Sequence, residues 1–259
     1  MKLNIPNNSG PQRDAAILER IHQGNFEITW TEVTSSIEGH TATFQVFADA
    51  LKIEGVRFGA GAGLAQKIAD TLGCSLLTPK LLELLYMQRA VTIPPFPMYD
   101  ATKMMTTEWF EAHSAKIDAE LVIKGYAGGI VQTTGKPWMI SNDLLLHPGH
   151  SENYGWFCPP GTGVNYRGCT TYASVGIPNI RVLQQPGWAH GLDQADYSET
   201  VTLVSLACDV DGQATDLRTV LQDKELAPLA SHQGVLRCLR QPGVPEPTDR
   251  AITLPEIAV

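Results

Sequence analysis

A histidine and a carboxylate lie six residues apart in a loop-like stretch, and this pair is the first candidate for chemistry. Residues 186–198 read Pro-Gly-Trp-Ala-His-Gly-Leu-Asp-Gln-Ala-Asp-Tyr-Ser. A carboxylate near a histidine fixes its tautomer and stabilises the protonated ring, as a general base requires. We therefore predict that His190 is a general base and Asp196 its orienting carboxylate, while Tyr197 and Ser198 hydrogen-bond a substrate. The alternative is that Asp196 and Ser198 only cap a turn.

The predicted site also includes four residues from earlier in the chain. Lys136, in Thr-Thr-Gly-Lys, and Asn142 carry polar groups suited to stabilise negative charge on a reacting oxygen. Tyr154 and Trp156 flank a glycine, and aromatic rings in such a segment line sugar and peptide grooves or simply fill a core. We count Lys136 and Tyr154 as catalytic candidates, and Asn142 and Trp156 as substrate-binding candidates.

Two other chemistries use neighbouring residues. Cys158 or Cys169 with His190 would form a thiol nucleophile and base, although neither cysteine begins a helix that would activate it. His147 and His150 form a His-x-x-His pair that could bind zinc together with His190. The intervening Pro-Gly predicts a turn, which does not align the two rings as a helix would, so the preferred site contains no metal.

The glycines at positions 59, 61 and 63 precede a predicted helix but do not form a nucleotide-binding motif. A dinucleotide fingerprint needs glycine at position 64, where the chain has Leu64. The run predicts a tight turn that leads into a helix. No cofactor is therefore expected.

The first half of the chain contains the elements with the clearest patterns. Apolar residues at helical spacing predict helices, and β-branched and aromatic runs predict a small antiparallel meander. Thr78 and Pro79 are typical of a helix start, and Gly24 and Gly73 of helix ends. The predicted helices are 11–24, 64–72, 79–87 and 105–124, and the predicted strands are 26–33, 41–47 and 50–56.

The second half is different in character. Residues 125–191 are rich in glycine, proline, aromatic residues and histidine, which predicts a loop-rich region with short strands. A strand at 200–207, a helix at 214–223 and an extended tail from 241 follow. The predicted fold is α+β, with helices packed on a mixed or antiparallel sheet. It divides into a helix-plus-meander half, 1–124, and a loop-rich half, 125–259, within one compact unit.

Composition and charge narrow the class of protein. Nineteen Lys and Arg against 27 Asp and Glu give a net charge of −8 over 259 residues, which disfavours nucleic acid and anionic membranes as partners. No signal peptide or transmembrane segment is readable, so a cytoplasmic protein is expected. The five cysteines, an odd number without a CxxC pair, are expected to be free thiols.

The chain resembles a group of uncharacterised bacterial proteins that join a helix-plus-meander part to a C-terminal part with a histidine loop and an Asp-Tyr-Ser strand start. The resemblance implies a shared architecture and shared polar positions, without a known activity. It also implies that Phe157 replaces a histidine and that His147 and His150 are peculiar to this chain. The residues that carry it are Ala16-Ile17-Leu18-Glu19, Gly24, 65–70, Gly73-Cys74, 77–80, Pro94-Pro95, Lys136, Asn142, 154–156, His190 and 196–198.

These observations favour a metal-independent hydrolase or acyl-type transferase that acts on a small peptide-like or glycan-like substrate through His190. The first alternative is a non-catalytic peptide- or sugar-binding module that uses the same pocket. The second is a metal-assisted hydrolase with His147, His150 and His190 as ligands. The expected partner is a small-molecule substrate, and a homodimer is left open.

Overall fold

A computed structural model describes residues 2–132, 134–162, 166–172, 174, 176–177 and 179–247. It confirms an α+β fold of helices and mostly antiparallel sheets. The helices are α1 Pro11–His22, α2 Ala62–Thr71, α3 Pro79–Met87, α4 Thr107–Ile123 and α5 Leu217–Gln222. The strands are β1 Trp30–Ile37, β2 His40–Phe47, β3 Lys52–Ile53, β4 Val56–Arg57, β5 Cys74–Leu76, β6 Val91–Thr92, β7 Val131–Gln132, β8 Trp138–Met139, β9 Ser151–Phe157, β10 Thr170–Tyr172, β11 Ile180–His190, β12 Leu203–Val210 and β13 Gln213–Asp216.

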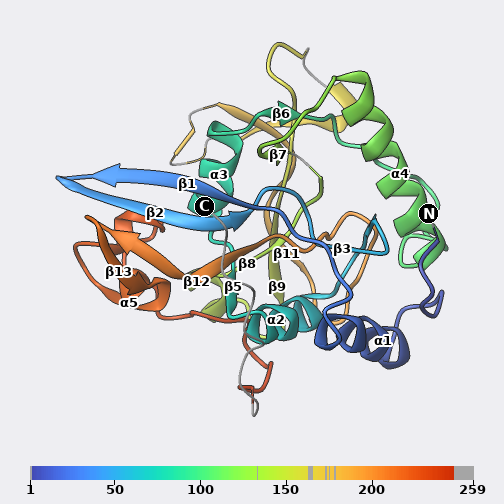
Figure 1. Cartoon of the computed structure of the whole chain (residues 1–259), viewed down its shortest axis with the longest axis horizontal. Helices are drawn as coiled ribbons and strands as arrows, with labels where there is room; N and C mark the ends of the chain where they lie inside the picture. The colour runs from blue at the N-terminus through green and yellow to red at the C-terminus, as the bar shows by residue number, and fades with distance from the viewer. Residues whose placement is uncertain are drawn as a thin grey trace.

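The larger sheet joins the two halves of the chain. Its order is β1-β2-β12-β13, and β5 pairs with the first residues of β12, 203–205, whereas β13 pairs with residues 207–210. The long β1–β2 hairpin extends from one side of the molecule, and β12 lies beside it although about 160 residues separate them in sequence (Figure 1). Strand β12 therefore ties the second half into the core of the first.

The four helices predicted in the first half are confirmed, and their end signals are local; the helix predicted at 214–223 is shorter, because residues 213–216 form β13 and only 217–222 are helical. Thr78 caps α3 by accepting a hydrogen bond from the Leu81 N–H at 3.1 Å, and Pro79 occupies the first turn. Gly24 and Gly73 adopt positive φ just after α1 and α2. The third predicted strand, 50–56, is instead the short hairpin β3–β4, because Glu54 and Gly55 turn the chain there.

The smaller sheet comes from the region predicted to be loop-rich. It has the order β10-β11-β9-β8, and β9 and β11 run through the centre of the molecule beside α3 (Figure 1). The eleven-residue β11 was not predicted, because Pro186 and Gly187 interrupt its pattern. This sheet positions both polar clusters described below.

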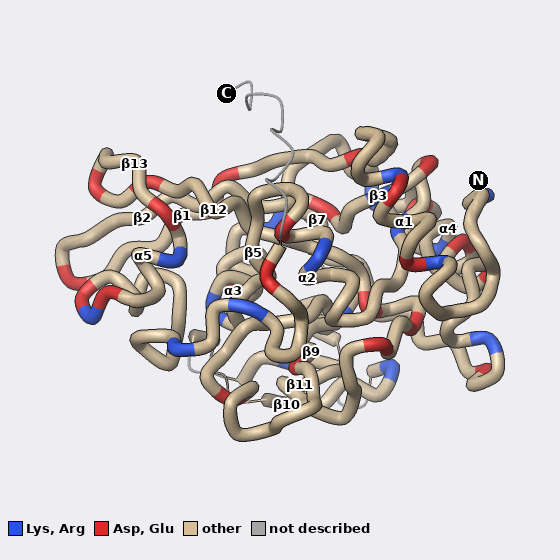
Figure 2. The backbone as a smooth tube through the Cα atoms, turned by 90° about the horizontal axis from the view of Figure 1, so that it is seen from below, with Lys and Arg blue, Asp and Glu red and all other residues tan. Residues whose placement is uncertain are grey.

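The structure bears on the predictions about charge, membrane spans and cysteines. Lys and Arg are interspersed with Asp and Glu along the chain (Figure 2). Within the described ranges, no helix is long and apolar enough to cross a bilayer. The prediction of free thiols is wrong for Cys158 and Cys169, which form a disulfide, whereas Cys74, Cys208 and Cys238 are free and buried.

Candidate functional site

The two central strands carry polar groups on both faces of the smaller sheet. On β9, Asn153 lies on one face and its neighbours Glu152 and Tyr154 contact groups on the other. On β11, one extra residue lies between the pairs Gly187↔Asn153 and His190↔Ser151, which is a β-bulge. The bulge directs Trp188 and His190 to opposite faces, whereas residues two apart in a regular strand share one face.

His190 belongs to a cluster of five polar residues on one face, here called the Lys136 cluster: Lys136, Asn153, His190, Asp196 and Glu199. Lys136 Nζ lies 3.2 Å from Asp196 Oδ2 and 3.7 Å from Glu199 Oε1. His190 Nε2 lies 3.7 Å from the same Glu199 oxygen. Asn153 Nδ2 donates a hydrogen bond to that oxygen at 3.3 Å. The structure thus brings together three of the predicted residues, His190, Asp196 and Lys136.

A tight turn at residues 196–199 presents both carboxylates. The Ser198 N–H donates to Asp196 Oδ1 at 2.6 Å, and the Asp196 N–H donates to Glu199 Oε2 at 3.0 Å. The Lys136 N–H donates to the Ser198 carbonyl at 2.8 Å, so the main chain that carries the lysine is bound to the same turn. Asp196 and Ser198 therefore do cap a turn, and the same Asp196 carboxylate also pairs with Lys136.

Two glycines let the backbone approach this turn closely. A Cβ on Gly135 would collide with Thr200 Oγ1 and the Ser198 carbonyl oxygen, and a Cβ on Gly59 would collide with the Asp196 carbonyl oxygen. The glycine run that begins at Gly59 thus supports the 196–199 turn. Only glycine fits at these two positions without a shift of the backbone.

The carboxyl group within ion-pair distance of His190 is that of Glu199, at 3.7 Å, and the sequence reasoning missed it. The predicted partner Asp196 acts on the ring through its charge, which favours the protonated form. Glu199 is completely buried, and burial together with the nearby Asp196 charge raises its pKa to about 8 although Lys136 opposes the shift. Partial burial, reinforced by the positive charge of Lys136, lowers the pKa of His190 below its usual 6.5. The imidazole side chain is 30% exposed, so a neutral ring can accept a proton from a molecule in solution.

Tyr154 and Trp156 do not form one wall, which corrects the prediction that they line a common pocket. Gly155 and Trp156 both have positive φ and break the alternation of β9. The Tyr154 hydroxyl donates to Glu83 Oε1 at 3.1 Å, while the Trp156 ring lies 6.0 Å from the buried His113 ring. Tyr154 therefore lies apart from the Lys136 cluster, and Trp156 packs in the core.

The remaining predicted binding residues are held by internal hydrogen bonds. Asn142 Nδ2 donates to the Val235 carbonyl at 2.9 Å, and its Oδ1 accepts from the Arg237 N–H at 2.8 Å. The Tyr197 hydroxyl accepts from the Met98 N–H at 2.7 Å. Ser198 is buried, and its hydroxyl donates to the Asp196 carboxylate. The structure thus does not bring Asn142 to the cluster, and it engages Tyr197 and Ser198 within the protein.

The two alternative chemistries are not assembled. Cys158 and Cys169 are bonded to each other, so neither is a free thiol nucleophile. His147 stacks on Trp188 with ring centroids 4.4 Å apart. Across the described part of the chain, no group of three or more His, Cys, Asp or Glu is arranged to hold a metal ion. The three histidines of the metal-assisted alternative therefore do not form a site.

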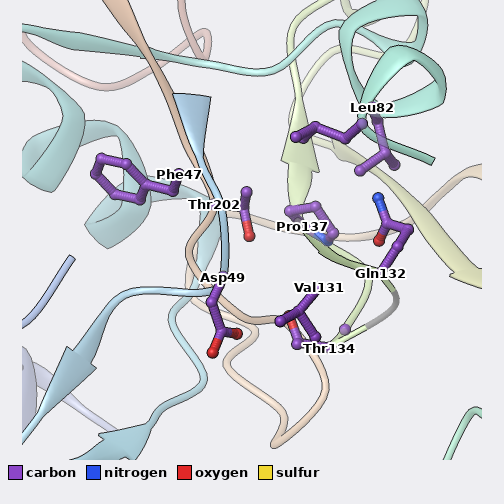
Figure 3. A pocket seen from close by; sticks show the side chains of 10 residues that line it. Phe47, Asp49, Leu82, Val131, Gln132, Thr134, Pro137 and Thr202 are labelled. Atoms are coloured by element: carbon purple, nitrogen blue, oxygen red, sulfur yellow. The ribbon is translucent and has the colours of Figure 1, made fainter. Parts of the chain in front are cut away.

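A small pocket lies next to the segment that carries Lys136. Its lining includes Gly135, Pro137, Asp49 and Thr202, and Figure 3 shows Pro137 and Thr202 on adjacent walls with Asp49 below them. Its volume of about 10 Å³ is close to that of one water molecule. None of the five residues of the Lys136 cluster lines this pocket.

Sequence reasoning could have found Glu199 by its spacing. It follows Asp196 by three residues, and Asp-Tyr-Ser-Glu has the spacing of a capping box. In that motif the carboxyl group of the fourth residue accepts a hydrogen bond from the N–H of the first, as Glu199 does from Asp196. Asn153 had no such signal, because its contact with Glu199 joins residues 46 positions apart.

Known proteins offer no guide to the function of this site. No family model, curated protein or solved structure matches the chain at a significant level.

Proposed function

We propose that the chain is a metal-independent hydrolase or acyl-type transferase for a small peptide-like or glycan-like substrate, with His190 as the general base. One observation carries the proposal: a partly exposed imidazole lies 3.7 Å from the completely buried Glu199 carboxyl group. The charge of Asp196 favours the protonated ring that forms when His190 accepts a proton, and the buried Glu199 carboxyl group, largely protonated near neutral pH, lies beside it.

The strand register supplies a hydroxyl opposite the proposed base. Ser151 pairs directly with His190, and directly opposed residues of antiparallel strands have their side chains on the same face. The Ser151 hydroxyl is buried and has no hydrogen-bond partner among the described residues. Ser151 is therefore the candidate nucleophile of an acyl-type transfer, with a water molecule in that role for direct hydrolysis.

Lys136 and Asp196 act through the base rather than on the substrate. Lys136 Nζ lies between the two carboxylates, and its side chain is only 10% exposed. In this position it offsets their repulsion and helps to keep His190 neutral. We therefore regard Lys136 as a positioning residue, in place of the oxyanion stabiliser predicted from the sequence.

Turnover of a chromogenic panel tests this proposal. The panel contains p-nitrophenyl esters, aminoacyl p-nitroanilides and p-nitrophenyl glycosides. We expect His190→Ala to lower kcat/KM at least about 100-fold, the usual contribution of a general base. His22→Ala, on the exposed end of α1, is the matched control and should leave turnover unchanged. Equal turnover by wild type and His190→Ala would refute the assignment.

A serine-directed fluorophosphonate separates the two nucleophiles. Covalent labelling of Ser151 that is lost in His190→Ala supports acyl transfer. Turnover that persists in Ser151→Ala assigns the attack to water. Binding of panel compounds without turnover would instead favour the binding-module alternative.

The cytoplasmic location stays a proposal that the disulfide makes testable. Structural disulfides persist mainly in oxidising compartments, because cytosolic reductants keep thiols reduced. A cytoplasmic protein should have Cys158 and Cys169 open to alkylation in cells lysed under trapping conditions. Protection of both thiols would place the protein in an oxidising compartment.

A further inference from the structure

A cavity of about 180 Å³ lies on the opposite face of the smaller sheet from the Lys136 cluster. Its lining comes from α3, the segment after β8, β9, β11 and the loop 231–236. His190, Lys136 and Asp196 do not line it. It is smaller than a typical pocket for a drug-sized ligand, so it can hold a group about as large as one amino-acid side chain.

Three carboxyl groups line this cavity, and among the described residues no lysine or arginine does. Glu83 and Glu152 are each only 1% exposed. Glu83 accepts hydrogen bonds from Tyr154 and from His232 Nε2, the latter at 2.9 Å. Asp143 Oδ2 accepts from Gln233 Nε2 at 2.7 Å. His232 is the one basic side chain among the lining residues, and it is paired with Glu83.

Glu152 lacks a positive partner. It accepts a hydrogen bond from the Ser141 hydroxyl, and no Lys, Arg or His in the described ranges lies within ion-pair distance of it. Burial, with a smaller contribution from Asp143, raises the pKa of Glu152 to about 7. A buried carboxylate without a cation is unfavourable, so a ligand that brings positive charge would be stabilised there.

The aromatic side chains of the cavity add a second, independent feature. Trp188 and Tyr172 line it. The His147 ring stacks on Trp188 at an interplanar angle of 14°, which fixes the indole. The buried Trp188 indole N–H lies beside the Glu152 carboxyl group and favours its charged form, although it does not reach the geometry of a full hydrogen bond. Aromatic rings beside carboxylates, with Ile140 and Leu236 as apolar walls, are the surroundings that an organic cation prefers.

We propose that this cavity is a binding site for a small organic cation, a primary ammonium or guanidinium group on a short apolar chain. The charged head lies between Glu152 and Asp143, and the apolar chain packs against Trp188. The proposal does not depend on the role of His190, because the two sites occupy opposite faces of the sheet.

Calorimetric titration with 1,5-diaminopentane, and with the neutral 1,5-pentanediol as its isostere, tests the proposal. We expect the diamine to bind with a Kd of about 1 mM or tighter, and the diol not to bind. Glu152→Gln should weaken diamine binding at least about tenfold, because it removes the unpaired carboxylate. Glu225→Gln, at an exposed position, is the matched control and should bind as wild type does.

The dependence on pH provides a second readout. Ionisation of Glu152 with a pKa of about 7 makes binding roughly tenfold tighter at pH 8 than at pH 6. The groups that face Glu152 or share the cavity are Ser141, Asp143, Trp188, Glu83, Tyr172 and His232. The change should disappear in Glu152→Gln and persist in His232→Gln.

Several outcomes would overturn the proposal. These are equal binding of the diol, no diamine binding up to about 20 mM, or full affinity in Glu152→Gln. Asp143→Asn, a change near the rim, serves as a second variant if Glu152→Gln fails to fold, and it should also weaken binding. His190→Ala should bind the diamine normally, so this test and the test of the proposed function can fail independently.

Discussion

The buried His113 on α4 makes stability depend on pH in a way that can be measured directly. Its ring is 1% exposed, lies 5.0 Å from the Tyr197 ring between centroids, and has no hydrogen-bond partner at either nitrogen among the described residues. Burial lowers its pKa to about 3, although the Asp196 charge partly opposes the shift. His113→Leu keeps a side chain of similar size and removes the titrating group.

The sign and size of the effect follow from proton linkage. Below pH 6.5 the unfolded chain protonates this histidine, while the folded protein keeps it neutral until about pH 3. The unfolded state therefore binds one more proton, and the free energy of unfolding falls by about 1.4 kcal/mol for each pH unit on acidification. Because the unfolded ring is half protonated at pH 6.5, the loss between pH 6.5 and 4.5 amounts to about 2.3 kcal/mol, a large part of the 5–15 kcal/mol typical of a domain.

Urea unfolding of wild type and His113→Leu from pH 7 to pH 4.5, followed by tryptophan fluorescence, measures this difference. Wild type should lose about 2.5 kcal/mol more than the variant over this range. His22→Leu, at an exposed histidine, should retain the wild-type slope. Parallel curves for wild type and His113→Leu would refute the conclusion that folding keeps His113 neutral.

Three further predictions concern the turn, its carboxylate and the disulfide. Gly135→Ala should lower the free energy of unfolding by about 1–3 kcal/mol, measured by urea titration, because its methyl group collides with the 196–199 turn. Between pH 4.5 and 8 the folded protein holds a proton on Glu199 that the unfolded chain has released, so the free energy of unfolding of wild type falls as pH rises. Glu199→Gln should reduce this fall. An unchanged slope of unfolding free energy against pH would contradict the raised pKa of Glu199. Reduction of the Cys158–Cys169 bond should lower stability by about 2–3 kcal/mol for its short loop, and mass spectrometry of the alkylated, unfolded, non-reduced protein should count three free thiols.

The parts of the fold that the sequence predicts well have short-range causes. The start of α3 depends on Thr78 and Pro79, and the end of α2 on Gly73, all within a turn of the helix they define. By contrast, β11 contains Pro186 and Gly187, and it is a strand because its partner β9 lies about 30 residues away. Contacts at that separation leave no local pattern.

In the candidate site, too, some features follow from the residues themselves and others depend on contacts distant in sequence. Grouping Lys136, His190 and Asp196 depended on residue chemistry, and the structure brings these three together. The prediction that Tyr154 and Trp156 line one pocket rested on their aromatic side chains and short spacing, and the positive φ values at 155 and 156 turn the two rings apart. Such a backbone reversal depends on packing against the segment that carries Gly135, which the sequence of β9 does not reveal.

The bulge in β11 also determines which length changes this strand can accept. Between Gly187 and His190 the chain has two residues where β9 has only Glu152. Loss of Ala189 would leave a regular pairing in which Trp188 still opposes Glu152 and His190 still opposes Ser151. Loss of a residue from β9 between Ser151 and Asn153 would instead turn the side chains on one side of the deletion onto the other face. One residue of β11 is thus dispensable, whereas the corresponding stretch of β9 has a fixed length as long as both faces keep their polar groups.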